Sequence, residues 1–126
     1  MTAPVAIVSQ AQQAVQVERL LEAIAAVESG GKMAKIGLHG ERSAWQLTKR
    51  AWQQVSKRPW YDAFDRRAAH EVAAAYVRYL IAELDRRGEE VTPWRVAIAF
   101  HSGLNSLRTD AAMAYASRVQ NLYNAH

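Results

Sequence analysis

Residues 17–48 read VERLLEAIAAVESGGKMAKIGLHGERSAWQLT, and the rest of the chain is organised around this stretch. An apolar stripe at spacings of four, three and four residues, which return to one face of an α-helix, ends in an acid: Val17, Leu21, Ile24 and Glu28. We expect partial desolvation there to raise the pKa of the Glu28 carboxyl group. Gly30 and Gly31 predict that the helix ends near Ser29, which leaves this carboxyl group at a helix end that a substrate can approach.

The composition fits one globular domain, which we expect to span residues 1–126. Half of the residues are apolar, as is typical of a folded chain. Sixteen Lys and Arg against twelve Asp and Glu give a net charge of +4, which favours an anionic partner such as cell-wall peptide stems, nucleic acid or a lipid surface. The basic residues are scattered through the chain, so we expect no nucleic-acid binding.

The sequence predicts neither a metal site nor a cofactor. It contains no cysteine, which removes disulfides and thiolate zinc sites. His70 and Glu71 begin the pattern of a zinc protease, but residue 74 is Ala. The histidines have no spacing typical of metal ligands: His39, His70, His101 and His126.

Periodicity and helix-end signals predict a mainly α fold with one irregular excursion. The expected helices cover residues 15–28, 49–55, 66–87 and 93–102, with a last helix that begins after Thr109. Residues 30–47 carry four glycines and little helical period, so we expect an irregular excursion or a small hairpin that forms one wall of a cleft, and residues 57–62 should form a surface loop. The residues expected to face the core are Val17, Leu20, Leu21, Ile24, Val27, Ala69, Val72, Ala73, Tyr76, Leu80, Leu84, Trp94, Ala97, Ile98, Phe100, Tyr115, Val119 and Leu122.

Four segments resemble, in order, the signatures of lytic transglycosylases and goose-type lysozymes, the family that carries the SLT domain. Residues 28–30, ESG, resemble its Glu-Ser-Gly signature, and residues 40–47, GERSAWQL, resemble the segment that ends in Gly-Leu-Met-Gln. Residues 96–103, VAIAFHSG, resemble Ala-Tyr-Asn-x-Gly, and residues 115–119, YASRV, resemble a closing Tyr-Val-x-x-Val helix. The resemblance covers residues 18–123 and implies a lysozyme-like helical domain that acts on the glycan strands of peptidoglycan.

The resemblance also implies roles for two acids. Glu28 would be the general acid that protonates the glycosidic oxygen between MurNAc and GlcNAc. In lytic transglycosylases the same residue then deprotonates the sugar's 6-hydroxyl, giving a 1,6-anhydro product without a second carboxylate. Glu41 stands in Gly-Glu-Arg, where goose-type lysozymes carry a Gly-Asp-Arg whose acid helps to position water, and about 6.5–9.5 Å between the two carboxyl groups would suit an inverting hydrolase. The alternative is a surface Glu41 paired with Arg42.

Five further residues occupy positions that lie near the substrate in the family: Ser29, Trp45, Gln46, His101 and Tyr115. Gln46 matches the glutamine that shapes the saccharide site, although the three residues before it differ from the family's Gly, Leu and Met. His101 takes the place of an asparagine that contacts the sugar, and Tyr115 that of a tyrosine whose hydroxyl lies near the acid. Trp45 and Trp52 could stack on sugar faces, and packing in the core is the alternative for both.

We therefore expect a cofactor-free enzyme that cleaves peptidoglycan, first a lytic transglycosylase. The alternatives are a hydrolytic lysozyme that uses Glu41 as its second carboxylate, and a nonenzymatic lysozyme-like module that binds peptidoglycan or, less readily, nucleic acid. Residues 1–16 lack the basic start of a secretory signal, and no stretch is long enough to span a membrane. We expect action on the cell wall, in the periplasm or outside the cell; neither the export route nor the oligomeric state follows from the sequence.

Overall fold

The computed structural model describes residues 9–105 and 108–125. Residues 1–8 of the stretch considered above as a possible secretory signal, and His126, lie outside the described residues. The elements in chain order are α1 (Gln10–Gln13), α2 (Val17–Ser29), α3 (Lys49–Val55), the 3-10 helix η1 (Trp60–Phe64), α4 (Arg66–Arg86), α5 (Pro93–Ser102) and α6 (Asp110–Asn124). The described residues form isolated β-bridges but no strand, so the predicted mainly α fold is confirmed.

Threonine side chains cap three helices at the positions that the sequence predicts. Thr48, Thr92 and Thr109 each accept a hydrogen bond from the backbone amide three residues later, at 3.0 to 3.1 Å. These bonds satisfy amides that have no partner within the helix. Pro93 occupies the first position of α5, where its missing amide costs nothing.

Three local predictions differ from the structure. The helix α1 was not predicted, because its four residues are too few for a periodic apolar pattern. Residues 57–62 were predicted as a loop, but η1 begins within them, closed by a bond from the Asp62 amide to the Pro59 carbonyl at 2.9 Å. Leu122 was predicted to face the core but is exposed, because Tyr115 and Val119 already complete the buried face of α6.

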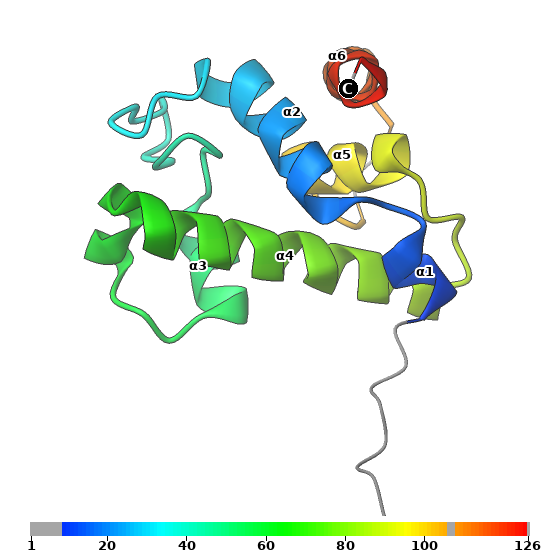
Figure 1. The fold of residues 1–126 in the computed structure, drawn as a ribbon, viewed down its shortest axis with the longest axis horizontal. Helices are drawn as coiled ribbons and strands as arrows, with labels where there is room; N and C mark the ends of the chain where they lie inside the picture. Colours follow the sequence, from blue (N-terminus) through cyan, green and yellow to red (C-terminus); the bar gives the residue numbers. More distant parts are fainter. Residues whose placement is uncertain (1–8, 106–107, 126) are drawn as a thin grey trace, which may run out of the picture.

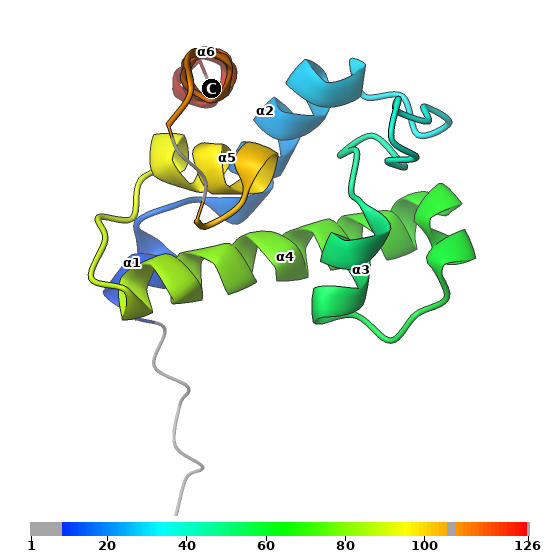
Figure 2. The same ribbon diagram turned by 180° about the vertical axis from the view of Figure 1, so that it is seen from behind.

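Helix α2 crosses the middle of the molecule and packs against α4 on one side and α6 on the other (Figure 1). Helix α5 lies behind α2 in this view and contacts both α4 and α6; the view from behind in Figure 2 brings α5 and α3 forward. The excursion after α2 and the start of α4 lie at one end of the molecule, away from α1. None of the helices within the described residues has the length and apolarity of a membrane span.

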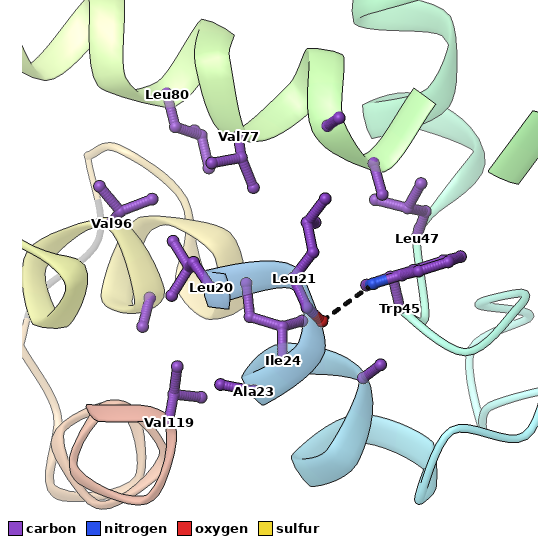
Figure 3. Packing of buried hydrophobic residues seen from close by; sticks show 14 of the residues in the cluster. Leu20, Leu21, Ala23, Ile24, Trp45, Leu47, Val77, Leu80, Val96 and Val119 are labelled. Carbon is purple, nitrogen blue, oxygen red and sulfur yellow. Dashed lines mark hydrogen bonds between the residues drawn. The ribbon is translucent and has the colours of Figure 1, made fainter. Parts of the chain in front are cut away.

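The core holds α2 in place along most of its length (Figure 3). Leu20, Leu21 and Ile24 are almost fully buried. They pack among side chains of the three other long helices: Val77 and Leu80 from α4, Val96 from α5 and Val119 from α6. Each such aliphatic side chain contributes about 1.5–3 kcal/mol by leaving water, so the backbone that carries Glu28 is firmly fixed.

Residues 30–48, between α2 and α3, form the irregular excursion that was predicted for residues 30–47. Arg42 pairs with Ile36 and with Leu47 through two isolated antiparallel bridges, which make a compact turn and not a regular hairpin. Ser43 and Gln46 adopt positive φ angles of 76° and 51°, a conformation that residues other than glycine adopt only where surrounding contacts hold them. The excursion is therefore an ordered structure attached to the end of α2.

Candidate active site at the end of α2

Glu28 lies in the last turn of α2, and its side chain is half-buried. Gly30 ends the helix with a φ of 65°, which would strain a residue with a Cβ atom. The amides of Gly30 and Gly31 bond back to carbonyl groups of the last turn at 3.1 and 3.2 Å. The predicted helix end near Ser29 is confirmed, and Glu28 stands one residue before it.

Several groups act on the charge of Glu28. Burial raises the pKa of its carboxyl group above the ordinary value, because desolvation penalises the charged form. The hydroxyl of Tyr115 donates a hydrogen bond to Oε2 at 3.2 Å, and this bond lowers the pKa of Glu28, as do the charges of Lys35 and Arg118. The charge of Glu41 raises it. Burial outweighs the opposing groups, as the sequence led us to expect.

Tyr115 and His101 form a tilted ring pair beside Glu28, with an angle of 33° between the ring planes. Tyr115 of α6 is buried, and burial raises the pKa of its phenol well above the ordinary range. The ring of His101, from α5, lies 4.5 Å from the ring of Tyr115, centroid to centroid, and its Nδ1 lies 2.6 Å from the hydroxyl oxygen of Ser102. Burial, together with the charge of Arg118, lowers the pKa of His101, so the neutral imidazole predominates at pH 7. The fold thus brings Glu28, His101 and Tyr115 together from three helices.

Two cations near Glu28 were not among the predicted site residues. Arg118 lies three residues after Tyr115 on α6, a spacing that places both on one face and could have pointed to it. The Lys35 ammonium group donates a hydrogen bond to the backbone carbonyl of Glu28. Lys35 belongs to the excursion, where no periodicity indicates which side chain turns towards the helix.

Glu41 lies on the excursion and is half-buried. Its Oε1 accepts a hydrogen bond from the backbone amide of His39 at 2.8 Å, and its charge acts on Glu28. The other oxygen of Glu41 and Oε1 of Gln46 both lie over Gly37, where a Cβ atom would collide with them. The two side chains therefore converge on the one residue of the excursion that leaves room for both.

Gln46 and Ser29 are tied to the backbone. The side-chain nitrogen Nε2 of Gln46 donates hydrogen bonds to the backbone carbonyl groups of Lys35 and Ser43, at 3.0 and 2.8 Å. The buried hydroxyl of Ser29 donates to the carbonyl of Ala44 at 2.7 Å and accepts bonds from two amides that follow the helix, at 3.0 and 3.1 Å. Ser29 thus holds the excursion against the end of α2, and Gln46 joins two parts of the excursion to each other. Direct contact with substrate stays a prediction for both.

Trp45 and Trp52, the two tryptophans considered for stacking on a sugar, lie in the core. The indole nitrogen of Trp45 donates to the carbonyl of Leu21 at 3.0 Å (Figure 3), and the ring meets the edge of His70. Trp52 is fully buried and donates to the carbonyl of Arg58 at 2.8 Å. This placement favours core packing over stacking on a sugar for Trp52. Trp45 is also buried, but it lines the cavity of about 850 Å³ described next.

Two cavities lie near these residues. One of about 850 Å³ lies between Leu21, Ala25 and the first turns of α4. Another of about 380 Å³ begins at Ser102 and Gly103, next to His101, and Glu28 lines neither of them. Within residues 9–105 and 108–125, no three His, Asp or Glu side chains are arranged to hold a metal ion.

Comparison with known proteins identifies the family. No curated protein and no solved structure matches the chain significantly. A family model described as the Transglycosylase SLT domain matches residues 6–123 and so covers nearly the whole chain. This match confirms the resemblance drawn from the four segments, and the mainly α structure agrees with the lysozyme-like fold of that family. The chain therefore belongs to the transglycosylase SLT domain family.

Proposed function

We propose that this protein is a lytic transglycosylase that cleaves the β-1,4 bond between MurNAc and GlcNAc. Membership of the family supports a transglycosylase-like function on peptidoglycan in general. One observation carries the finer proposal: Glu28 is a half-buried acid with a raised pKa, and the buried hydroxyl of Tyr115 lies 3.2 Å from it. A carboxyl group that keeps its proton closer to neutral pH is suited to general acid catalysis.

In the proposed reaction, Glu28 acts first as an acid and then as a base. It gives its proton to the glycosidic oxygen while the bond from that oxygen to the anomeric carbon breaks, which leaves positive charge on the sugar ring. Tyr115, Lys35 and Arg118 favour the carboxylate that results. The carboxylate then removes the proton of the same sugar's 6-hydroxyl, whose oxygen bonds to the anomeric carbon. The products are a 1,6-anhydro end and a reprotonated Glu28.

Residues on both sides of Glu28 are proposed to hold the glycan. His101 lies on the α5 side and, as a neutral imidazole, offers one donor and one acceptor to a sugar hydroxyl or N-acetyl group. On the side of the excursion, Gln46 presents Oε1 beside the carboxylate of Glu41. A glycan strand bound between α5 and the excursion would pass directly over Glu28.

A hydrolytic lysozyme is the second candidate, and Glu41 is the observation that favours it. Its negative charge raises the pKa of the Glu28 carboxyl group, although less than burial does, and this supports a role for the pair. In that mechanism Glu41 would activate a water molecule that attacks the anomeric carbon, and the product would carry an ordinary reducing end. The hydrogen bond from the His39 amide already engages one oxygen of Glu41, so we place this mechanism second.

Product analysis distinguishes the two mechanisms. Purified peptidoglycan is digested with the wild type, with Glu28→Gln and with Glu41→Gln, and the released muropeptides are analysed by mass spectrometry. We expect anhydro-muropeptides from the wild type and a loss of at least about 100-fold in Glu28→Gln, because a general acid contributes 10²–10⁴ in rate. Glu41→Gln should still release anhydro products.

The exposed Glu22 of the same helix supplies the matched control, since Glu22→Gln removes a carboxylate from α2 six residues before Glu28. Its rate should equal that of the wild type. Reducing ends that disappear in Glu41→Gln would establish the hydrolase instead. If the wild type releases nothing while a control muramidase digests the same material, the protein is a binding module with a lysozyme-like fold.

A further inference from the structure

The large hydrophobic side chains exposed in the described part of the chain are unevenly distributed. Four of them belong to two segments at one end of the molecule: Ile36 (61 % exposed), Leu38 (98 %), Tyr61 (78 %) and Phe64 (38 %). The remaining one, Leu122 (39 %), lies on α6. Single exposed apolar residues are normal, whereas a cluster indicates a surface that binds something. We call these four side chains the apolar end.

Arg42 connects the two segments of the apolar end. It is paired with Ile36 across a β-bridge, and paired residues direct their side chains to the same face. Its guanidinium group lies over the rings of Trp60 and Phe64, 4.5 and 4.7 Å from their centroids, and donates to the Trp60 carbonyl at 3.0 Å. The ring of Tyr61 lies 5.8 Å from that of Phe64. Arg42 therefore links the segment that carries Ile36 to the 3-10 helix that carries Tyr61 and Phe64.

Leu38 is presented on a braced turn. The amide of Gly40 bonds to the carbonyl of Gly37 at 3.1 Å, which closes a four-residue turn with Leu38 at its second position. The carboxylate of Glu41 accepts a bond from the His39 amide within the same turn. The turn therefore holds the nearly fully exposed Leu38 in a fixed position. Because its backbone is already ordered, binding through Leu38 costs little further conformational entropy.

The excess positive charge of the protein lies in the same part of the chain. Residues 30–67 contain nine Lys or Arg and three Asp or Glu, a net charge of +6, whereas the whole chain has +4. The expectation that basic residues are scattered is therefore wrong at this scale. Two of the three acids also accept backbone hydrogen bonds: Glu41 within the turn, and Asp65 from the Ala68 amide at the start of α4.

We propose that the apolar end adsorbs to the surface of an anionic lipid bilayer. Ile36 and Leu38 enter the headgroup region, Tyr61 and Phe64 lie at the interface, and the surrounding basic residues face the lipid phosphates. A polyanion such as nucleic acid would offer the aliphatic side chains of Ile36 and Leu38 no apolar surface to bind. Exposed apolar side chains next to a basic segment therefore favour a lipid bilayer as the partner. Both segments lie at the same end of the molecule (Figures 1 and 2), so one flat surface can meet them together.

Adsorption in this orientation would hold the candidate active site close to a membrane, because Glu41, Gln46 and Lys35 belong to the same excursion as Ile36 and Leu38. The inference does not depend on the chemistry at Glu28. An inactive protein would adsorb equally well.

Vesicle co-sedimentation tests the proposal. The full chain is mixed with phosphatidylcholine vesicles that either contain or lack phosphatidylglycerol, an anionic lipid whose surface charge attracts basic residues. We expect binding to the anionic vesicles that is about tenfold weaker without phosphatidylglycerol. The double variant Ile36→Asn and Leu38→Asn should bind at least about tenfold more weakly than the wild type, since two side chains no longer enter the bilayer.

Leu122→Asn is the matched control, because it removes an exposed leucine from α6, outside the two segments of the apolar end, and should bind like the wild type. Circular dichroism and unfolding in urea establish that the variants are folded. Failure of the wild type to bind anionic vesicles overturns the proposal. Binding that the double variant retains, or that a soluble polyglycerol phosphate abolishes completely, would show attraction by charge alone and overturns the insertion of the tip.

Discussion

At Glu28, burial and hydrogen bonding act on the same proton in opposite directions. Desolvation raises the pKa of the carboxyl group, while the hydroxyl of Tyr115 and the charges of Lys35 and Arg118 lower it. A group used alternately as acid and base benefits from this opposition, because neither of its protonation states is strongly disfavoured.

Tyr115→Phe should remove the hydrogen bond and leave the buried ring in place. Because that bond lowers the pKa of Glu28, we expect the alkaline limb of the pH–rate profile to move to higher pH, with about a tenfold lower maximal rate. Tyr123→Phe is the control, since its hydroxyl lies on the same helix but accepts a bond from the Gln16 amide. A profile of Tyr115→Phe that overlies the wild type would contradict the role of the hydroxyl.

The raised pKa of Glu28 also predicts how stability changes with pH. The folded protein holds this proton more tightly than the unfolded chain, so the contribution to stability is present below the ordinary pKa of 4.5 and is lost as pH rises through the folded pKa. Glu28→Gln, which cannot ionise, should therefore be more stable than the wild type at pH 7 and equally stable near pH 3, about one unit below the ordinary carboxyl pKa. Urea unfolding at several pH values measures this difference, and an unchanged difference at every pH would contradict it.

At the scale of elements, the end of α2 and the excursion act as a unit. Ser29 joins them through its bond to the Ala44 carbonyl, and Gln46 joins two parts of the excursion to each other. The position of Glu41 and Gln46 relative to Glu28 therefore depends on buried hydrogen bonds and not on the helices.

Ser29→Ala should leave the buried Ala44 carbonyl without its partner and cost about 1–3 kcal/mol of unfolding free energy. It should also lower the cleavage rate, because the excursion is released from the helix that carries Glu28. Thr48→Ala is the comparison: losing the cap of α3 costs about 1 kcal/mol and leaves the end of α2 intact. If both variants lose activity in proportion to stability alone, Ser29 has no special role in the site.

At the scale of the whole molecule, the core residues of α2 pack among side chains of α4, α5 and α6. A substitution in α2 should therefore change the unfolding free energy of the whole molecule. Ile24→Ala should cost about 2–5 kcal/mol, because neighbouring helices cannot fully close the cavity. We expect the chain to form a single domain, and urea should therefore give one cooperative transition for the wild type and the variant, seen equally by tryptophan fluorescence and circular dichroism. Transitions that separate between the two probes would contradict that expectation.

Much of the fold could be predicted, because the signals are local. The threonine caps, the glycines that end α2 and the apolar periodicity of α2 and α4 concern residues within a few positions of one another. The same holds for Glu28, whose place at the end of an apolar stripe predicts its partial burial. Leu122 continues such a stripe but is exposed, because periodicity does not reveal where the neighbouring helices end.

The sequence alone determined the five longer helices α2 to α6 and their approximate ends, the family signatures and the position of Glu28 at a helix end. Only the tertiary structure decided which groups surround Glu28 and that Trp45 lies in the core. It also decided that Arg42 links two segments that carry exposed apolar side chains. Those contacts join residues far apart in the chain. Within the excursion, the backbone has neither helical nor strand periodicity from which the direction of a side chain could be predicted. There the direction of each side chain depends on hydrogen bonds and packing that form only when the whole chain has folded.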